Sequence, residues 1–315
     1  MLKPRSRCLS AALGGRATAA GAKLGAPAGK AATLVTSATT PGASAPFIRS
    51  TVVFAAANAL GLGISLATGW HYHLDLLGTG AFAAAAFATA GTELRQRASA
   101  ACVGLWAVKL AGFLFYRALQ THRDGRLEDV LATSAGATGF WTISLAWGVV
   151  VSLPHTLAAG VATASRPAFG RVSDLAGIGL FVAGLCLETA ADAQKWQFKS
   201  DAATRGGFCD VGVWTLSQHP NWLGNLMLWS GVVLLNAPTL LAAGRPATTL
   251  LGALASPLFM VALFYGQATG KVGNAPQLAE AKYGADARFQ AYVRDVPLVV
   301  PSTGHVLSWL GCYSE

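Results

Sequence analysis

Charged residues are scarce in this chain of 315 residues, since Asp, Glu, Lys and Arg together make up only 12% of it. An average soluble domain carries roughly 25%. Hydrophobic residues account for 53%. This composition excludes an ordinary soluble domain and predicts an integral membrane protein in contact with a lipid bilayer. No polar linker divides the apolar part, so we expect a single polytopic domain.

Cysteine pairs and metal-ligand clusters are also missing. The five cysteines are single and widely spaced, at Cys8, Cys102, Cys186, Cys209 and Cys312. No pair has the spacing of zinc ligands, and an odd, scattered set does not form a disulfide framework. His71 and His73 lie two residues apart with no third ligand beside them. We therefore predict no metal site.

Acidic residues are absent from the first 50 positions, which carry seven basic residues. Beyond them, 16 basic residues are nearly balanced by 14 acids, so the net charge of +9 belongs mainly to the N-terminus. It does not indicate a nucleic-acid surface. Spaced basic residues among Ala, Ser, Thr and Gly, without an apolar core, are typical of a mitochondrial or plastid transit peptide. We predict such a peptide over residues 1–46, and hence an organelle membrane; a disordered basic tail is the alternative.

Apolar segments follow one another along the rest of the chain. They cover residues 51–68, 76–91, 100–119, 136–153, 173–187, 222–243 and 247–267. A helix needs ~20 apolar residues to cross a bilayer, so the shorter segments leave six or eight spans open. The predicted fold is an all-α membrane bundle of about seven transmembrane helices over residues 47–302, followed by a tail, 303–315.

Seven spans place three polar segments on one side of the membrane: residues 121–129, residues 191–218 and the chain after residue 267. These segments are more basic than those predicted for the other side. The basic side of a membrane protein faces the cytosol, or the matrix or stroma of an organelle. A soluble dinucleotide is available on that side.

The most polar stretch between two spans covers residues 188–225. A helix over residues 188–199 places Glu188, Asp192, Lys195 and Lys199 within roughly 60° of one another. Two acids one turn apart repel each other. The acids would suit sugar hydroxyls and the lysines would suit phosphates. The alternative is a solvated helix face with lysines reaching to the membrane surface.

A second helix is predicted to begin at Pro220, because proline is favoured at the first helical position and excluded from the interior. Asn221 and Asn225 then lie one turn apart. Free backbone N–H groups at a helix N-terminus favour anions. His219 and Asn221 could therefore bind a phosphate or an amide. The alternative is simple capping of the helix by Ser217 or His219.

Lys109 falls inside the segment 100–119, where a cation costs ~2.5–3.5 kcal/mol on insertion scales and usually faces a polar interior. Trp106, Lys109, Phe113 and Tyr116 share one helical face. This pattern favours a cavity in which Lys109 lies near a bound anion and Tyr116 offers a proton. The alternative is a lysine that reaches the membrane surface beside packed aromatics.

Four patterns together resemble the steroid 5-alpha-reductase-like membrane proteins, in particular the broad uncharacterised DUF1295-type group. The pattern D-x-Q-x-x-x-F-K is matched by Asp192, Gln194, Phe198 and Lys199, and the run G-L-W-x-x-S-R-H-P-N-Y-x-G by Gly212, Trp214, Ser217, His219, Pro220, Asn221 and Gly224. The C-terminal pattern of the group is matched by Tyr283, Gly284, Phe289, Tyr292, Pro297 and Pro301. The segment W-x-x-R-L…R is resembled by Trp106, Lys109, Leu110 and Arg117. The resemblance spans roughly residues 100–302.

The chain departs from the group at four positions. Gln218 stands where the group has Arg, Trp222 where it has Tyr, Asn225 where it has an acid, and Lys109 where it tends to have Arg. A neutral glutamine cannot supply the bidentate phosphate contact of a guanidinium. These departures bear directly on cofactor binding.

The resemblance implies NADPH-dependent reduction of a C=C bond conjugated to a carbonyl in a small lipophilic substrate. The chain has no Gly-rich dinucleotide fingerprint, so the nucleotide would lie between helices. The implied cofactor ligands are Glu188, Asp192, Lys199, His219, Asn221 and Asn225. Lys109 and Tyr116 are the catalytic candidates.

Two other functions stay open. Isoprenylcysteine carboxyl methyltransferases share an R-H-P-x-Y-x-G pattern and use S-adenosylmethionine, although the longer pattern from Asp192 to Lys199 favours the reductases. A non-catalytic membrane protein that kept the bundle is the third possibility, because Gln218 and Asn225 replace charged residues of the group.

Overall fold

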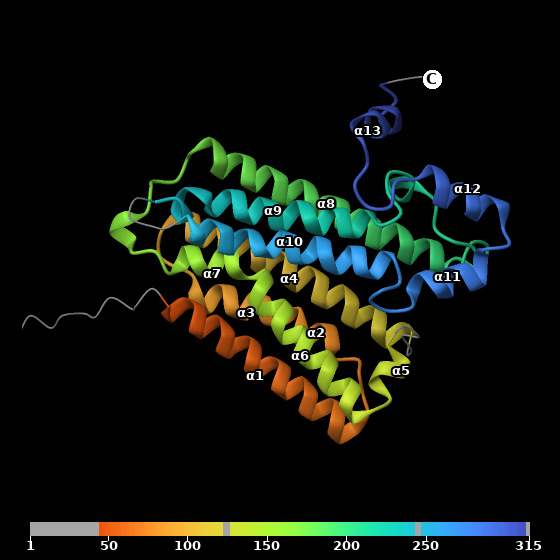
Figure 1. The fold of residues 1–315 in the computed structure, drawn as a ribbon, viewed down its shortest axis with the longest axis horizontal. Helices are drawn as coiled ribbons and strands as arrows, with labels where there is room; N and C mark the ends of the chain where they lie inside the picture. Colours follow the sequence, from red (N-terminus) through yellow and green to blue (C-terminus); the bar gives the residue numbers. More distant parts are fainter. Residues whose placement is uncertain (1–43, 122–126, 243–246, 313–315) are drawn as a thin grey trace, which may run out of the picture. The chain divides into compact units, whose positions relative to one another are not determined.

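The computed structural model describes residues 44–121, 127–242 and 247–312. Every regular element in these residues is a helix, which confirms the predicted all-α class (Figure 1). The predicted transit peptide falls almost entirely on residues outside the described ranges. It stays a prediction.

Six helices are long and apolar enough to cross a membrane, so the protein is an integral membrane protein. They are α1 (Ala45–Thr68), α4 (Leu94–Thr121), α6 (Ser134–Val151), α8 (Val172–Ser200), α9 (Pro220–Leu240) and α10 (Thr248–Ala268). The span predicted at residues 76–91 is instead a pair of short helices, α2 (Leu74–Gly78) and α3 (Gly80–Thr89). Their 16 residues from Leu74 to Thr89 reach only ~24 Å, less than the hydrocarbon core of a bilayer.

The two polar helices predicted around residues 188–225 are both present. The segments predicted at 173–187 and 188–199 form one continuous helix, α8, and α9 begins at Pro220 as expected. The alternative of a simple side-chain cap is not found, because neither Ser217 nor His219 caps the free N–H groups of α9. The Ser217 hydroxyl instead accepts a hydrogen bond from the backbone N–H of His219 and donates one to the carbonyl oxygen of Val299.

Helices α8 and α9 lie side by side in close contact (Figure 1). A Cβ atom added to Gly184 would lie 2.5 Å from the carbonyl oxygen of Gly224, and one added to Gly224 would lie 2.5 Å from that of Gly184. Gly177 and Gly231 make a second contact of this kind one heptad away. Small residues let membrane helices approach until their backbones touch. This contact places Glu188 of α8 opposite Asn225 of α9.

An aromatic core joins α3, α4, α6 and α9. Phe82 is fully buried, and its ring centroid lies 5.2 Å from that of Trp106, 4.7 Å from Trp147 and 5.6 Å from Trp229. The first two pairs are edge-to-face, and such pairs add about 0.5–1.5 kcal/mol each beyond their burial. The Trp106 indole also donates a hydrogen bond to Glu188, so this aromatic core helps to position that acid.

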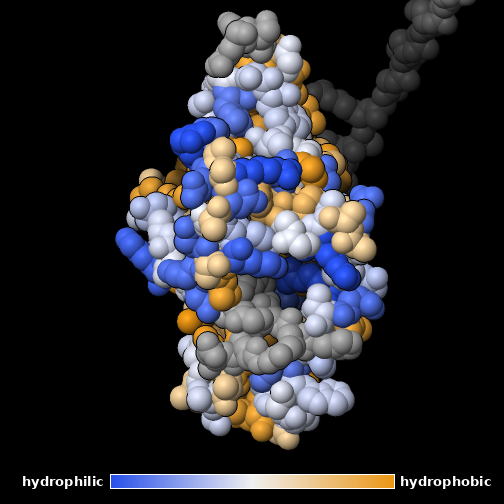
Figure 2. Space-filling view, turned by 90° about the vertical axis from the view of Figure 1, so that its right-hand side faces the viewer, coloured by the Kyte–Doolittle hydropathy of each residue, from blue (hydrophilic) through white to orange (hydrophobic). Residues whose placement is uncertain are grey.

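The ends of α4, α8 and α10 and the start of α9 lie at one end of the bundle, which we call the site end (Figure 1). The C-terminal helices α11 (Ala275–Tyr283), α12 (Ala287–Asp295) and α13 (Thr303–Trp309) follow α10 there, and α12 and α13 donate hydrogen bonds to η2 (Gly212–Thr215). The short helix α5 (Glu128–Leu131) also lies at this end (Figure 1). Hydrophilic side chains gather over this end (Figure 2).

The starts of α4 and α8 and the end of α9 lie at the other end, which we call the opposite end (Figure 1). It also holds α7 (Leu153–Ala159) and η1 (Thr163–Ser165). The three polar segments predicted to share one side of the membrane are accordingly together at the site end, within the described residues.

Candidate functional site

A buried group of acids, amides and one lysine lies between α4, α8 and α9. Glu188 is 2% exposed, and its Oε1 accepts hydrogen bonds from the Trp106 indole, at 3.3 Å, and from the Asn225 amide. The ammonium of Lys109 lies 2.8 Å from Oδ2 of Asp192 and 3.5 Å from Oε2 of Glu188. Lys109 therefore faces a polar interior, where it contacts two acids that would otherwise repel each other.

Three buried oxygens at this site have no hydrogen-bond partner: Oε2 of Glu188, Oδ1 of Asn225 and Oδ1 of Asn221. Glu188 Oε2 has only the ionic contact with Lys109. An unsatisfied buried acceptor costs about 1–3 kcal/mol. All three atoms accept hydrogen bonds, so a ligand with hydroxyl or amide N–H donors would relieve this cost. We call these three oxygens the acceptor cluster.

His219 and Trp222 form a flat stack at the start of α9. Their ring centroids lie 3.8 Å apart with planes 10° from parallel, and Trp222 stacks in turn on Phe264. Burial, aided by the nearby charge of Lys195, lowers the pKa of His219 to about 4. The imidazole is therefore neutral at physiological pH. It can offer a hydrogen bond or a flat surface to a ligand, but no positive charge.

Lys199 lies away from the acceptor cluster. It is 11 residues beyond Glu188, which is ~16 Å along the helix. Its ammonium donates hydrogen bonds to the Tyr283 hydroxyl, at 3.0 Å, and to the carbonyl oxygen of Gly207. Burial would raise the pKa of Tyr283, but hydrogen bonds from Lys199 and Lys282 lower it overall. Lys199 thus holds the loop after α8 against α11.

Tyr116 lies at the outer end of the face predicted for α4. That face does meet α8, since Phe113 and Tyr116 both contact the Trp196 ring, at centroid distances of 6.5 and 5.6 Å. The Tyr116 side chain is half exposed and lies two turns beyond Lys109. The structure therefore brings Lys109, Glu188, Asp192 and Asn225 together but leaves Tyr116 outside this group. Its role as proton donor stays a prediction.

The motif residues between α8 and α9 mostly hold the connecting loop in place. Gln194 Oε1 accepts a hydrogen bond of 2.9 Å from the backbone N–H of Val213, and the Trp214 indole donates one of 3.0 Å to the carbonyl oxygen of Ala191. Gly212 has φ of 57° and packs so closely that an added Cβ would lie 2.5 Å from Gln194 Oε1. Only glycine adopts this conformation readily in that space.

Gln218, where the resembling group has Arg, anchors the C-terminal segment. Its Nε2 donates hydrogen bonds of 2.6 Å to the carbonyl oxygen of Val296 and 3.0 Å to that of Val293. Its backbone N–H donates to the carbonyl oxygen of Pro297 at 2.9 Å. Sequence reasoning missed this function, because the partners are backbone atoms about 80 residues away that no side-chain pattern reveals.

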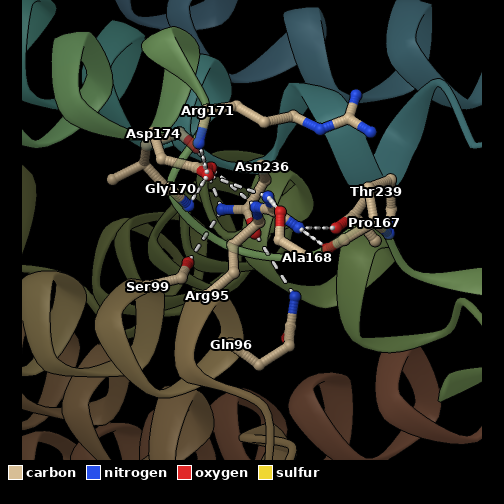
Figure 3. Close-up of polar contacts among 11 residues, drawn as sticks. Arg95, Gln96, Ser99, Pro167, Ala168, Gly170, Arg171, Asp174, Asn236 and Thr239 are labelled. Atoms are coloured by element: carbon tan, nitrogen blue, oxygen red, sulfur yellow. Dashed lines mark hydrogen bonds and ion pairs between the residues drawn. The ribbon is translucent and has the colours of Figure 1, made fainter. Parts of the chain in front are cut away.

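A second buried polar group, which sequence reasoning also missed, lies at the opposite end (Figure 3). The Arg95 guanidinium forms a bidentate pair with Asp174, at 2.7 and 2.9 Å, and donates to the carbonyl oxygens of Pro167 and Ala168. Asp174 Oδ2 also accepts from the backbone N–H groups of Gly170 and Arg171. Each charge is satisfied within the protein, which indicates a structural role.

Neutral polar residues continue inward from this pair. Asn236 of α9 donates a hydrogen bond of 2.8 Å to the Ser99 hydroxyl of α4, which lies 2.9 Å from Nδ1 of His155 in α7. Gln96 donates to Asn236 at 3.3 Å. These bonds tie three helices together. Among the residues described, no three His, Cys, Asp or Glu side chains are close enough to hold a metal ion.

A comparison with known protein families gives a match over most of the chain. A family model described as "Protein of unknown function (DUF1295)" matches residues 62–296, which is most of the chain and includes every residue of the candidate site. No curated protein and no solved structure matches. The chain therefore belongs to the DUF1295 family, within the steroid 5-alpha-reductase-like group of membrane proteins.

Proposed function

We propose that this protein is a membrane-embedded reductase that uses NADPH to reduce a C=C bond conjugated to a carbonyl in a lipid-like substrate. The acceptor cluster carries the proposal. Three unpartnered oxygens from two helices lie where apolar spans end and the polar site end begins. Ribose hydroxyls and a nicotinamide carboxamide are donors that would satisfy these oxygens. The proposal rests further on membership of the steroid 5-alpha-reductase-like group.

Each residue would have a different task. Glu188 and Asn225 would accept hydrogen bonds from the ligand, while Lys109 holds Asp192 and Glu188 in position. The start of α9 offers free backbone N–H groups and the positive end of a helix dipole to phosphates. His219 would pack against the ligand as a neutral ring. Lys199 already binds Tyr283 and Gly207, so it would act on the ligand only by keeping the loop in place.

The reaction would place a hydride from the cofactor on the β carbon of the substrate, so that negative charge develops on the carbonyl oxygen, and uptake of a proton at the α carbon would complete the reduction. A hydrogen-bond donor must stabilise this oxygen. Tyr116 is the proposed donor and stands on the face of α4 that follows Lys109. The apolar helices would exclude water and orient the substrate.

A ligand-induced shift of the thermal midpoint tests the proposal directly. The purified full chain in detergent would be titrated with NADPH and, separately, with S-adenosylmethionine. A ligand at 100 times its dissociation constant stabilises the folded state by ~2.7 kcal/mol. We expect a shift with NADPH. A shift with S-adenosylmethionine alone would identify a methyltransferase instead, and no shift with either would indicate a non-catalytic bundle.

Variants of the acceptor cluster locate the site. Asn221→Ala and Glu188→Gln are expected to abolish the NADPH shift, because they remove acceptors. The matched controls are Gln197→Ala and Glu280→Gln, which change the same chemical groups at exposed positions. If all four variants respond like the wild type, the acceptor cluster does not bind the cofactor.

A further inference from the structure

A separate cavity of about 380 Å³ opens at the site end between the end of α1, α2, the end of α4 and α5. Cavities of roughly 300–1,000 Å³ are typical of small-molecule sites. We propose that this cavity binds a single-chain lipid with a carboxylate head group, of the fatty-acid class. The inference does not depend on the proposed reductase activity.

The apolar part of the cavity fits a hydrocarbon chain. Leu74, Leu114 and Leu131 belong to its lining, and they come from three different helices. Trp70 also lines it and is 67% exposed, so it stands on the open side. Its ring lies 6.3 Å from that of Tyr72. Trp and Tyr are enriched at the border between membrane and water, which is where the head group of a lipid lies.

The polar part of the cavity fits a carboxylate. Arg117 lines it from α4, and a guanidinium can bind a carboxylate through two parallel hydrogen bonds. His71 lines it from the α1–α2 connection, and its Nδ1 is buried without a hydrogen-bond partner. Burial, aided by His73, lowers the pKa of His71, so the ring is neutral and can donate a hydrogen bond from Nδ1. A carboxylate between the two would satisfy this atom.

Asp75 also lines the cavity and works against a bound anion. It also has an interaction within the protein. Because the Asp75 carboxylate repels the carboxylate of a bound lipid, Asp75→Asn should strengthen the binding of such a lipid. A purely apolar cavity would not respond in this way, and a cavity for cations would respond in the opposite direction.

Binding would be measured by calorimetry with the full chain in phosphatidylcholine nanodiscs. The probes are dodecanoate, its neutral counterpart 1-dodecanol, and acetate, which is the head group alone. We expect saturable binding of dodecanoate, at least about tenfold weaker binding of 1-dodecanol because the charged hydrogen bonds are lost, and no measurable binding of acetate. Equal affinity for dodecanoate and 1-dodecanol would overturn the carboxylate assignment.

Paired variants on one helix locate the binding. Arg117→Ala and Leu114→Trp, which remove the cation and fill the cavity, should weaken dodecanoate binding. Arg97→Ala and Leu105→Trp make the same changes at exposed positions of α4 and should leave it unchanged. If Arg117→Ala does not fold, Arg117→Lys keeps the charge without the bidentate fork and should give a smaller loss.

Two results would refute the proposal: binding that survives Leu114→Trp, and displacement of dodecanoate by NADPH or inorganic phosphate. The second would assign the cavity to the nucleotide. If the acceptor-cluster variants lose the NADPH shift while dodecanoate binding persists, the two sites are separate. If NADPH fails to bind at all, dodecanoate binding still tests the lipid site alone.

Discussion

The two ends of the bundle both bury charged residues, but they differ in how those charges are satisfied. At the opposite end, Arg95 donates two hydrogen bonds to Asp174 (Figure 3). Backbone groups bind both side chains as well, since Arg95 donates to the carbonyl oxygen of Ala168 and Asp174 accepts from the backbone N–H of Gly170. At the site end, Glu188 shares Lys109 with Asp192 and retains an oxygen without a hydrogen-bond partner. The asparagines nearby each retain another.

This difference distinguishes a structural ion pair from the proposed binding site. A buried charge whose hydrogen-bonding positions are all filled by the protein cannot bind a ligand. If its partner is removed, the charge stays in the low-dielectric interior without compensation, which destabilises the fold. A buried acceptor without a partner raises the free energy of the empty protein, and a ligand can lower it again. Equivalent acid-to-amide substitutions at the two ends should therefore have opposite consequences for stability and binding.

The largest effect is expected at the opposite end. Asp174→Asn leaves the Arg95 charge buried without a counter-charge, and breaking such a pair costs about 3–5 kcal/mol. The free energy of unfolding, measured by denaturant titration in detergent, should fall by this amount while NADPH binding of the folded fraction persists. The double variant Arg95→Met/Asp174→Leu should recover most of the loss. A loss below about 1 kcal/mol, as for an exposed pair, would contradict this account.

The contact between α8 and α9 should give the next largest effect. A methyl group at Gly224 would lie 2.5 Å from the carbonyl oxygen of Gly184, so Gly224→Ala should cost about 1–3 kcal/mol by overpacking. It should also weaken ligand binding, because it displaces Asn225. The control is Gly179→Ala on the outer side of α8, where an added Cβ meets nothing within 4 Å. That variant should be neutral or stabilising, by up to ~1 kcal/mol. Equal behaviour of the two would refute the close approach.

Acidification should destabilise the site end through His219. Its pKa of about 4 in the folded protein lies below the usual 6.5, so between these pH values the unfolded chain binds more protons. The stabilisation is complete above pH 6.5 and is lost as the pH falls towards 4, at no more than about 1.4 kcal/mol per pH unit. Comparing the pH dependence of unfolding for wild type and His219→Asn tests this. The variant should show a flatter profile over that window, and an unchanged profile would contradict a neutral His219.

Glu188→Gln should have the smallest effect on stability. Lys109 keeps Asp192 as a partner, and the new amide can donate to the free Oδ1 of Asn225. We expect the free energy of unfolding to change by less than about 1 kcal/mol, far less than for Asp174→Asn. The NADPH-induced shift should nevertheless disappear. A large loss of stability would show that Glu188 is a structural acid like Asp174, and would remove the contrast between the two ends.

Local sequence rules predicted the features that depend on neighbouring residues. Pro220 marked the start of α9, and the run of apolar residues before Glu188 marked the helix that carries it. The cost of Lys109 within a span correctly indicated a polar interior. The second predicted span failed because Leu74–Thr89 holds too few residues for a full crossing, and six long helices are present.

Features that depend on distant partners could not be predicted. Arg95 and Asp174 are 79 residues apart, and nothing near either residue shows that the other will neutralise it. Lys199 fits a phosphate-binding pattern on the helical wheel, yet the chain returns through α11 and places Tyr283 against it. Gln218 lacks the positive charge of the arginine in the motif. In the structure it anchors the C-terminal segment instead, because it donates hydrogen bonds to three carbonyl oxygens there.

The backbone contact through Gly184 and Gly224 limits how this protein can admit a ligand. Because the backbones of α8 and α9 touch at these glycines, we expect the two helices to move as one unit and the distance from Glu188 to Asn225 to stay fixed. We therefore expect a ligand to enter by displacement of α4 or α10, or of the loop between α8 and α9 and the C-terminal helices. Spectroscopic labels across α8 and α9 should report no movement, whereas labels from α4 to these two helices should.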